Sequence, residues 1–301
     1  MSVPASYLAV VLIWSTTPLA IQWSGDGVGF EFGVFMRMLV GLCALLLIVR
    51  LRRLAMPWDA HARRVYLAGG ISLYVAMSCV YWSAQYIPSG WLSVIFGLSP
   101  LFTSILAVLI LDNGAITGGR LFGLMLGLAG LSIMFAESFS LSSAALLGVA
   151  GVTLSAFSQS LGAVLLQKLK PGMPAVSITA GSLIVALPLF ALNCVIGAGW
   201  PDVIPSRTLL AIVYLALFGT SIGFPLYFYL LKHISAERVA LIALITPVLA
   251  LLLGSALNDE VISSRVWLGT ACVLCGLAWY EYGKYLPLKK PWRVRWKQRP
   301  M

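Results

Sequence analysis

Arg37 is the residue whose type and position point most directly to chemistry. It lies well inside the apolar stretch 28–49, where a charged side chain facing lipid would cost several kcal/mol. Arg37 must therefore face the protein interior. Glu31 stands six residues earlier on the same predicted helix, which is a poor spacing for an ion pair. Two roles remain open for Arg37: hydrogen bonding to backbone carbonyl groups, or binding and gating of a substrate carboxylate.

The first apolar stretch, residues 3–24, is interrupted by polar side chains. Trp14, Ser15, Thr16 and Thr17 follow one another, and Pro18 comes next. Such a run is costly against lipid, and Pro18 leaves a carbonyl one turn earlier without its helical N–H partner. We expect these residues to line a cavity, with close packing of small residues between helices as the alternative. The indole of Trp14 would suit an aromatic or amphipathic ligand through stacking, and a cation through cation–π attraction.

A second stripe of polar and aromatic side chains lies in the stretch 64–84. Tyr74, Ser78 and Tyr81 are spaced by four and three residues, so they share one face of a helix. The complete set of predicted substrate-binding residues is Trp14, Ser15, Thr16, Arg37, Tyr74, Ser78, Tyr81, Trp82, Ser99, Ser158, Gln159, Tyr227 and Thr246. The prolines predicted to bend their helices, either as gates or as purely structural kinks, are Pro18, Pro100, Pro225 and Pro247.

The sequence contains no Walker or H-E-x-x-H pattern, and its two histidines, His61 and His233, lie in predicted basic loops. Cys272 and Cys275 form a C-x-x-C, but they lie in an apolar stretch without a nearby histidine. Small-residue packing explains this pair better than metal or redox chemistry does. We therefore expect neither an enzyme nor a cofactor.

The composition requires a membrane. Of the 301 residues, 60% are apolar and 10% are charged, and the mean hydropathy is +0.96, whereas soluble domains are roughly 45–50% apolar and about 25% charged. A spanning helix needs about 20 mostly apolar residues. The ten stretches predicted to span are 3–24, 28–49, 64–84, 90–111, 119–137, 143–166, 174–197, 208–231, 237–257 and 265–284. The predicted fold class is thus an all-α integral membrane protein with ten transmembrane helices in the lipid bilayer.

The 20 Lys and Arg residues are distributed unevenly between the two ends of these stretches. If the N-terminus is inside, the outer loops carry only Arg207 and Arg265, while the inner loops and the C-terminal segment carry all the others except Arg37. This bias places both termini in the cytoplasm, and we expect a multi-pass protein of the bacterial inner membrane. The basic segment 285–301 is expected to lie on anionic headgroups, and no nucleic-acid partner is expected.

The sequence repeats itself at an offset of about half its length. Ile87, Pro100 and Asp112 recur 147 positions later as Ile234, Pro247 and Asp259. Each half would hold five spans, and because five is odd the second half would enter the membrane from the opposite side. Inverted repeats of this kind place a binding site at the midplane between the halves. The predicted units are 1–140, 141–284 and a basic cytoplasmic tail, 285–301.

These features together resemble the drug/metabolite transporter superfamily, and its ten-helix EamA branch in particular. The resemblance covers nearly the whole chain and rests on Ile13-Trp14-Ser15-Thr16, on Arg37, on the hairpins that end in Pro100 and Pro247, and on glycine-rich fifth and tenth helices. Members often carry Glu after the proline helices, where this chain has Asp112 and Asp259-Glu260. The resemblance implies a basket of helices around a central cavity, with the fifth and tenth at the periphery. It also implies export of small-molecule substrates, namely amino acids with aromatic ones included and related metabolites, by alternating access.

Coupling and oligomeric state each have two readings. No carboxylate stands in the middle of a predicted span, which disfavours proton coupling and favours downhill export. The alternative is a carrier of drugs, nucleosides or other metabolites with proton coupling or uptake. Gly119, Gly123 and Gly127 form a face for close helix approach, either within the bundle of a monomer or at a homodimer seam.

Overall fold

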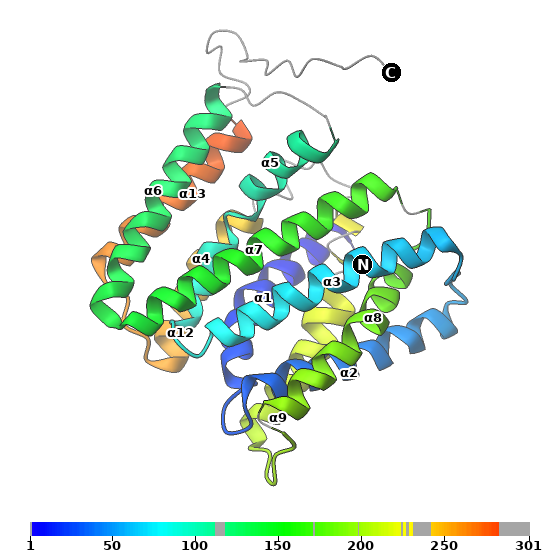
Figure 1. Ribbon diagram of the computed structural model, residues 1–301. Helices are drawn as coiled ribbons and strands as arrows, with labels where there is room; N and C mark the ends of the chain where they lie inside the picture. Colours follow the sequence, from blue (N-terminus) through cyan, green and yellow to red (C-terminus); the bar gives the residue numbers. More distant parts are fainter. Residues whose placement is uncertain are drawn as a thin grey trace.

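The computed structural model describes residues 2–111, 118–170, 172–197, 199–223, 225–226, 229–230 and 242–282. Every regular element in these ranges is a helix (Figure 1). The helices are α1 (Val3–Trp23), α2 (Phe30–Leu51), α3 (Ala60–Ser83), α4 (Ser89–Phe96), α5 (Ser99–Leu111), α6 (Gly118–Leu141), α7 (Ser143–Leu169), α8 (Ala175–Ile196), α9 (Ser206–Tyr214), the π-helix η1 (Leu215–Ile222), α12 (Ile242–Asn258) and α13 (Ser264–Tyr282).

Helical residues occupy each of the ten predicted stretches. Six helices are long and apolar enough to cross a membrane: α1, α2, α3, the combined α4 and α5, α7 and α8. Shorter apolar helices lie at 125–134, 206–222 and 245–258. The prediction of an all-helical multi-pass membrane protein is confirmed, whereas ten spans in two inverted halves stay a prediction. The predicted tail, 285–301, lies outside the described residues.

The fourth predicted stretch is divided into two helices. α4 ends at Phe96, and α5 begins at Ser99, directly before Pro100. A proline has no N–H to donate to the carbonyl four residues earlier, and its ring clashes with that carbonyl, which here belongs to Phe96. Pro18 and Pro247, in contrast, lie inside the continuous helices α1 and α12.

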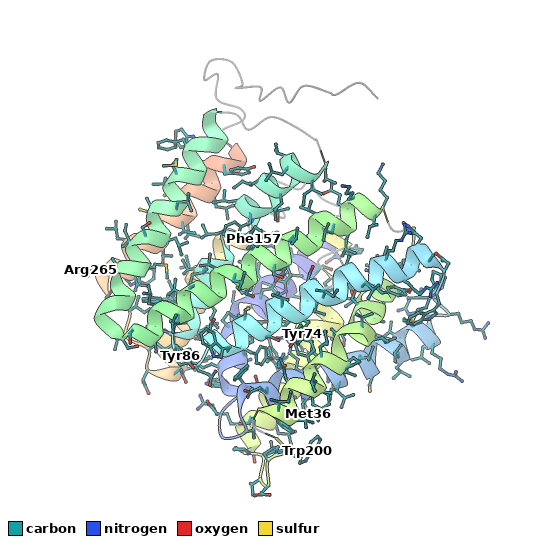
Figure 2. All side chains as sticks on the ribbon, viewed as in Figure 1. Met36, Tyr74, Tyr86, Phe157, Trp200 and Arg265 are labelled. Carbon is teal, nitrogen blue, oxygen red and sulfur yellow. The ribbon has the colours of Figure 1, made fainter. Side chains whose placement is uncertain are left out.

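The helices form a bundle with one pair at its edge. α3 packs between α7 and α8, while α1 packs against α12 and α2 packs against both α8 and η1. In Figure 1, α7 and α3 run side by side, and α6 lies along α13 at one edge of the molecule. Large apolar side chains project from the outer helix surfaces (Figure 2), Phe157 of α7 among them. Outward apolar faces match a protein that has lipid as its solvent.

Glycines let α6 and α13 approach until their backbones touch. A Cβ on Gly123 would lie 2.6 Å from the carbonyl oxygen of Gly276, and one on Gly130 would lie 2.5 Å from the carbonyl oxygen of Gly269. Gly127 is also covered, because a Cβ on Gly276 would lie 2.6 Å from the Gly127 nitrogen. The glycine face is therefore occupied by a helix of the same chain. Packing within the bundle accounts for Gly123 and Gly127, whereas a homodimer through the face that also includes Gly119 stays a prediction.

Candidate functional site

Arg37 lies inside the bundle and donates hydrogen bonds to two neighbouring helices. Its side chain on α2 is 4% exposed. Nε donates to Thr220 Oγ1 on η1 at 3.3 Å, and Nη1 donates to the Tyr81 hydroxyl on α3, also at 3.3 Å. The guanidinium carbon lies 5.9 Å from the centre of the Tyr81 ring. Both partners are neutral, and because a guanidinium has five N–H donors, donors remain for a further group.

Two glycines bring Arg37 and Trp14 to the same part of the eighth stretch. A Cβ on Gly219 would lie 3.4 Å from Arg37 Nη2 and 3.9 Å from Thr17 Oγ1. A Cβ on Gly223 would lie 3.5 Å from Trp14 Nε1. The two glycines are four residues apart, which is about one helical turn. We refer to Trp14, Thr17, Arg37, Tyr81 and Thr220 as the Arg37 cluster.

The π-helix η1 carries the part of the cluster that faces α2. Its Ser221 hydroxyl donates to the Ala216 carbonyl, five residues earlier, at 2.9 Å. α2 approaches it closely at Gly41, where a Cβ would lie 3.1 Å from Thr220 Cγ2. π-helical turns are rare and frequently occur at functional sites. Here the turn places a hydroxyl group next to a buried guanidinium.

The hydroxyl groups of α1 bond mainly to the backbone of α1 itself. Ser15 is 1% exposed and donates to the Val11 carbonyl at 2.7 Å. Thr16 bonds to the Leu12 and Ile13 carbonyls and shares a further hydrogen bond with the Tyr214 hydroxyl of α9. Of the predicted α1 residues, half-buried Trp14 is the one that lies at the Arg37 cluster. A binding role for Ser15 and Thr16 stays a prediction.

Two predicted aromatic residues contact helices outside the cluster. The Tyr74 hydroxyl donates to Asn193 Oδ1 of α8 at 3.0 Å. The Tyr74 ring packs edge-on against Phe190, with 5.1 Å between the two ring centres. Trp82 meets Tyr86 edge-on at 5.0 Å and lies against α7, where a Cβ on Gly151 would be 3.2 Å from its ring. Tyr74 and Trp82 thus join α3 to α8 and α7, and their predicted contact with substrate stays a prediction.

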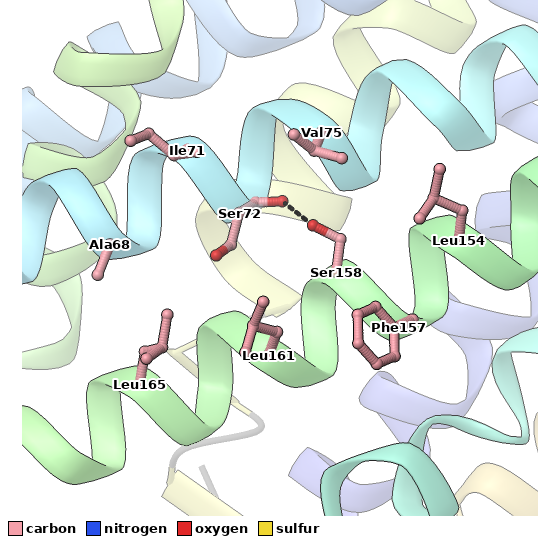
Figure 3. A pocket seen from close by; sticks show the side chains of 9 residues that line it. All are labelled: Ala68, Ile71, Ser72, Val75, Leu154, Phe157, Ser158, Leu161 and Leu165. Carbon is pink, nitrogen blue, oxygen red and sulfur yellow. Dashed lines mark hydrogen bonds between the residues drawn. The ribbon is translucent and has the colours of Figure 1, made fainter. Parts of the chain in front are cut away.

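Ser158 lies at an apolar cavity between α3 and α7. The cavity has a volume of about 380 Å³ and is lined by Ala68, Ile71, Ser72, Val75, Leu154, Phe157, Ser158, Leu161 and Leu165 (Figure 3). The Ser158 hydroxyl donates to the Ser72 carbonyl at 3.2 Å. Ile71 and Leu154 are more than half exposed, so this cavity opens to the outer surface of the bundle. The neighbouring predicted residue, Gln159, is exposed.

The remaining predicted residues are spread over several helices. Ser78 and Ser99 have buried hydroxyl oxygens without a hydrogen-bond partner among the described residues, and the Ser99 carbonyl accepts from Ser160 Oγ at 3.0 Å. Thr246 is buried in α12. Pro225 is half-buried, and Tyr227 lies outside the described residues. Among the described residues of the predicted set, Arg37 and Tyr81 are in direct contact, and Trp14 lies near them through the neighbouring glycines Gly219 and Gly223.

The predicted substrate-binding set did not include Thr17 or Thr220, although Thr17 belongs to the run in α1 that the sequence predicts to line a cavity. A signal was available, because the apolar run of the eighth stretch is interrupted by Gly219, Thr220 and Ser221. Small and polar residues at mid-span indicate either close helix packing or a cavity. That interruption does not show how α2 and η1 are rotated and shifted relative to each other, which is what brings Thr220 opposite Arg37.

The Arg37 cluster has the chemistry of a binding site for an anionic group beside an aromatic surface. It offers a guanidinium and hydroxyl groups but, among its members, no carboxylate, thiol or imidazole that could serve as a nucleophile or base. Within the described part of the chain, His, Cys, Asp and Glu side chains do not form a group of three that could hold a metal ion. The geometry suits recognition of a ligand.

Comparison with known proteins gives the family of the chain. The model of the EamA-like transporter family matches twice, over residues 5–136 and 146–281. The chain is 29% identical to the "Uncharacterized inner membrane transporter YedA" of Escherichia coli K12, over 94% of this chain and 92% of that protein. It is also 25% identical to the "Probable amino-acid metabolite efflux pump" of the same organism, over 63% of this chain and 66% of that protein.

A solved crystal structure has the same fold. It superposes with a TM-score of 0.65 at 20% sequence identity, and the match covers 92% of this chain and 96% of the other. Two matches to one family model together cover most of the 301 residues. This chain therefore belongs to the EamA-like transporter family, within the drug/metabolite transporter superfamily.

Proposed function

We propose that this protein exports amino acids, aromatic ones included, and related small metabolites by alternating access, down their concentration gradients. The proposed location is the bacterial inner membrane, with both termini in the cytoplasm. The observation that carries the proposal is Arg37, a buried cation whose hydrogen-bond partners, Tyr81 and Thr220, are both neutral. The name of the efflux pump among the relatives agrees with this substrate class.

A substrate carboxylate would provide the charge that Arg37 lacks. A buried charge is costly unless it is paired, and no carboxylate in the described part of the chain forms an ion pair with Arg37. A guanidinium binds a carboxylate through two parallel N–H···O bonds. The two hydrogen bonds to Thr220 and Tyr81 use Nε and Nη1, so Nη2, which lies against Gly219, would donate one of them.

Trp14 would contact the substrate side chain. Its indole lies against Gly223, about one helical turn from the position where Gly219 meets Arg37. An α-amino acid with an aromatic side chain carries its carboxylate and its ring a few bonds apart, which suits this separation. Aromatic pairs contribute about 0.5–1.5 kcal/mol beyond their buried area.

Alternating access is supported by a symmetry between the two halves of the chain. A glycine contact between the first half and the second has an equivalent in which the two corresponding residues have swapped roles. Gly123 corresponds to Gly269, and Gly130 to Gly276, at an offset of 146. The observed contacts are Gly123 with Gly276 and Gly130 with Gly269, which is the pattern that a two-fold axis between equivalent units produces. Helix packing shows the same symmetry. α5 corresponds to α12 and α7 corresponds to α1; α5 packs on α7, and α12 packs on α1. The double match to the family model points the same way.

The positions of the acidic side chains support downhill export. Among the described helices, Glu31 stands in the first turn of α2, Glu137 and Glu281 stand near the ends of α6 and α13, and Glu260 follows α12. The Arg37 cluster contains no acidic residue, so it offers no proton-binding carboxylate next to the substrate. Transport should therefore not require a pH gradient.

Efflux from proteoliposomes tests this function. Liposomes loaded with labelled phenylalanine should release it faster when they contain the protein, at equal rates with and without a pH gradient. A panel with a nucleoside and a cationic drug covers the alternative substrates. Release that occurs only with a pH gradient, or only of the nucleoside or the drug, would replace the proposal with proton-coupled or drug transport.

Trp14→Ala should slow phenylalanine release about tenfold, because an aromatic contact at the upper end of its range corresponds to about a factor of ten. The matched control is Trp267→Ala, which removes a partly exposed indole from α13 and should leave the rate unchanged. Full activity of Trp14→Ala would remove Trp14 from the binding site.

A further inference from the structure

The helix ends at one end of the bundle are joined by a hydrogen-bond network centred on Glu260. This is the end where α1 and α12 finish and α4 begins, and the charge distribution of the sequence assigns it to the outside. The Glu260 carboxylate accepts from the backbone N–H of Ser89 at 2.9 Å and from that of Gly90 at 3.3 Å. It also accepts from Asn258 Nδ2 at 3.1 Å. A residue after α12 thus holds the start of α4.

The same network continues from Asn258 to α1. Asn258 Nδ2 donates to Gln22 Oε1 at 3.0 Å, and Asn258 Oδ1 accepts from Trp23 Nε1, also at 3.0 Å. Gln22 Nε2 in turn donates to the carbonyl of Ala84 at the end of α3, at 3.2 Å. Four helix ends from both halves of the chain, those of α1, α3, α4 and α12, are therefore connected through Gln22, Asn258 and Glu260.

Glycines make room for this closed arrangement. A Cβ on Gly254 would lie 2.4 Å from Glu260 Oε2, so the carboxylate occupies the space that a side chain would fill. A Cβ on Gly90 would lie 2.8 Å from Leu251 Cα, so α4 and α12 are in backbone-level contact. The contact between the two helices and the network that ties their ends form one unit.

The network lies over the Arg37 cluster. Gln22 is five residues beyond Thr17 and eight beyond Trp14 along α1, which corresponds to about 7 to 12 Å at 1.5 Å per residue. On α2, Arg37 likewise lies a few turns from the end that begins at Phe30. α1 packs against both α4 and α12, which also pack against each other, so a solute that leaves the Arg37 cluster along α1 at this end would pass between these three helices.

We infer that Glu260, with Asn258 and Gln22, is the latch of an outer gate: the network holds α4 and α12 against α1 and closes the path from the Arg37 cluster to the outside. This inference rests on the proposed transport function. The latch consists of hydrogen bonds between side chains and helix ends, so it can break and re-form without any change in the helices themselves. Opening at this end would release the exported substrate.

Thiol accessibility tests the latch independently of transport. The five native cysteines are replaced by alanine and Thr17 by cysteine, which places a reporter beneath the network. A charged, membrane-impermeant maleimide is then applied to right-side-out and to inverted membrane vesicles. In Glu260→Gln an amide N–H₂ group replaces one of the two acceptor oxygens. This group cannot accept a hydrogen bond from the N–H donors that the carboxylate bound, so the network is weakened. The labelling rate should rise at least tenfold, and only in right-side-out vesicles.

Two further variants separate the latch from a general loss of structure. Gly254→Ala displaces the carboxylate without changing any charge and should raise labelling to the same extent. Asp259→Asn is the matched control, because Asp259 is exposed, adjacent to Glu260, and has a positive φ of 51° that asparagine also tolerates. Its labelling rate should stay within twofold of the parent.

The inference is overturned if Glu260→Gln and Gly254→Ala both label at the parent rate, or if Asp259→Asn rises with them. If Glu260→Gln does not give a folded protein by size-exclusion chromatography, Gly254→Ala decides the question. Faster labelling without any flux in liposomes would support the gate and contradict the proposed transport. Normal flux in all variants, together with unchanged labelling, would support the proposed transport and contradict the gate.

Discussion

Replacing Arg37 by methionine should reduce phenylalanine efflux at least a hundredfold while leaving the protein folded. Hydrogen bonds to charged groups contribute about 1.5–3 kcal/mol each, so loss of a two-bond carboxylate clamp corresponds to about two orders of magnitude or more. Methionine has a similar length and no charge, so it removes the cost of burying an unpaired cation while filling much of the same space. The measurement is the initial efflux rate from proteoliposomes that contain equal amounts of protein.

The reading of Arg37 as a purely structural residue predicts a different outcome. Transport of phenylalanine is compared with that of phenylalaninamide, which lacks the carboxylate. If Arg37 binds the carboxylate, the parent prefers phenylalanine and Arg37→Met loses that preference. If Arg37 only holds Tyr81 and Thr220 in place, the variant keeps the preference and its thermal stability in detergent falls. Arg50→Gln, which changes an exposed arginine on the same helix, is the control and should alter neither property.

Gly276→Ala should destabilise the protein by about 3 kcal/mol, the upper end of the range for overpacked interiors. The added Cβ would lie 2.6 Å from the Gly127 nitrogen and 2.7 Å from the Gly123 carbonyl oxygen. Both are backbone atoms, which cannot rotate away as a flexible side chain can. The expected result is a clear drop in the thermal unfolding midpoint in detergent, and Gly276→Leu should prevent recovery of monodisperse protein.

The control for this substitution is Gly172→Ala. No atom lies within 4 Å of a Cβ at Gly172, and its φ is not positive. This variant should match the parent or be slightly more stable, because alanine has less backbone freedom to lose on folding. Equal midpoints for Gly276→Ala and Gly172→Ala would mean that α6 and α13 can separate without cost, which would contradict a tight glycine-mediated pair.

The two expected effects differ in kind because the two sites differ in what they contact. The Gly276 contact lies at the edge of the bundle and holds two helices together, so its loss should lower stability. Arg37 lies in the interior with unused donors, so its loss should lower transport. Measuring both properties on Arg37→Met, on Gly276→Ala and on their two controls would show whether stability and function are carried by separate parts of the molecule.

What the sequence determined by itself is the position of the helices and the burial of Arg37. Apolar runs of about 20 residues can only be helical in lipid, since each backbone N–H and C=O must then be bonded within its own segment, and helices such as α1 and α8 accordingly match the predicted stretches within one or two residues. A charge such as Arg37 cannot face lipid, so its inward orientation also followed from its position alone. The family resemblance depended on the same local features.

What only the tertiary structure decided is which distant side chains meet. The sequence singled out Arg37 and Tyr81 separately, but their contact with each other and with Thr220 depends on the rotation and height of three helices. The network of Gln22, Asn258 and Glu260 went unnoticed for the same reason, because Gln22 and Asn258 are 236 residues apart. Hydropathy fixes where a helix begins and ends, whereas the face that it turns to its neighbours is set by packing between side chains, which a single sequence does not reveal.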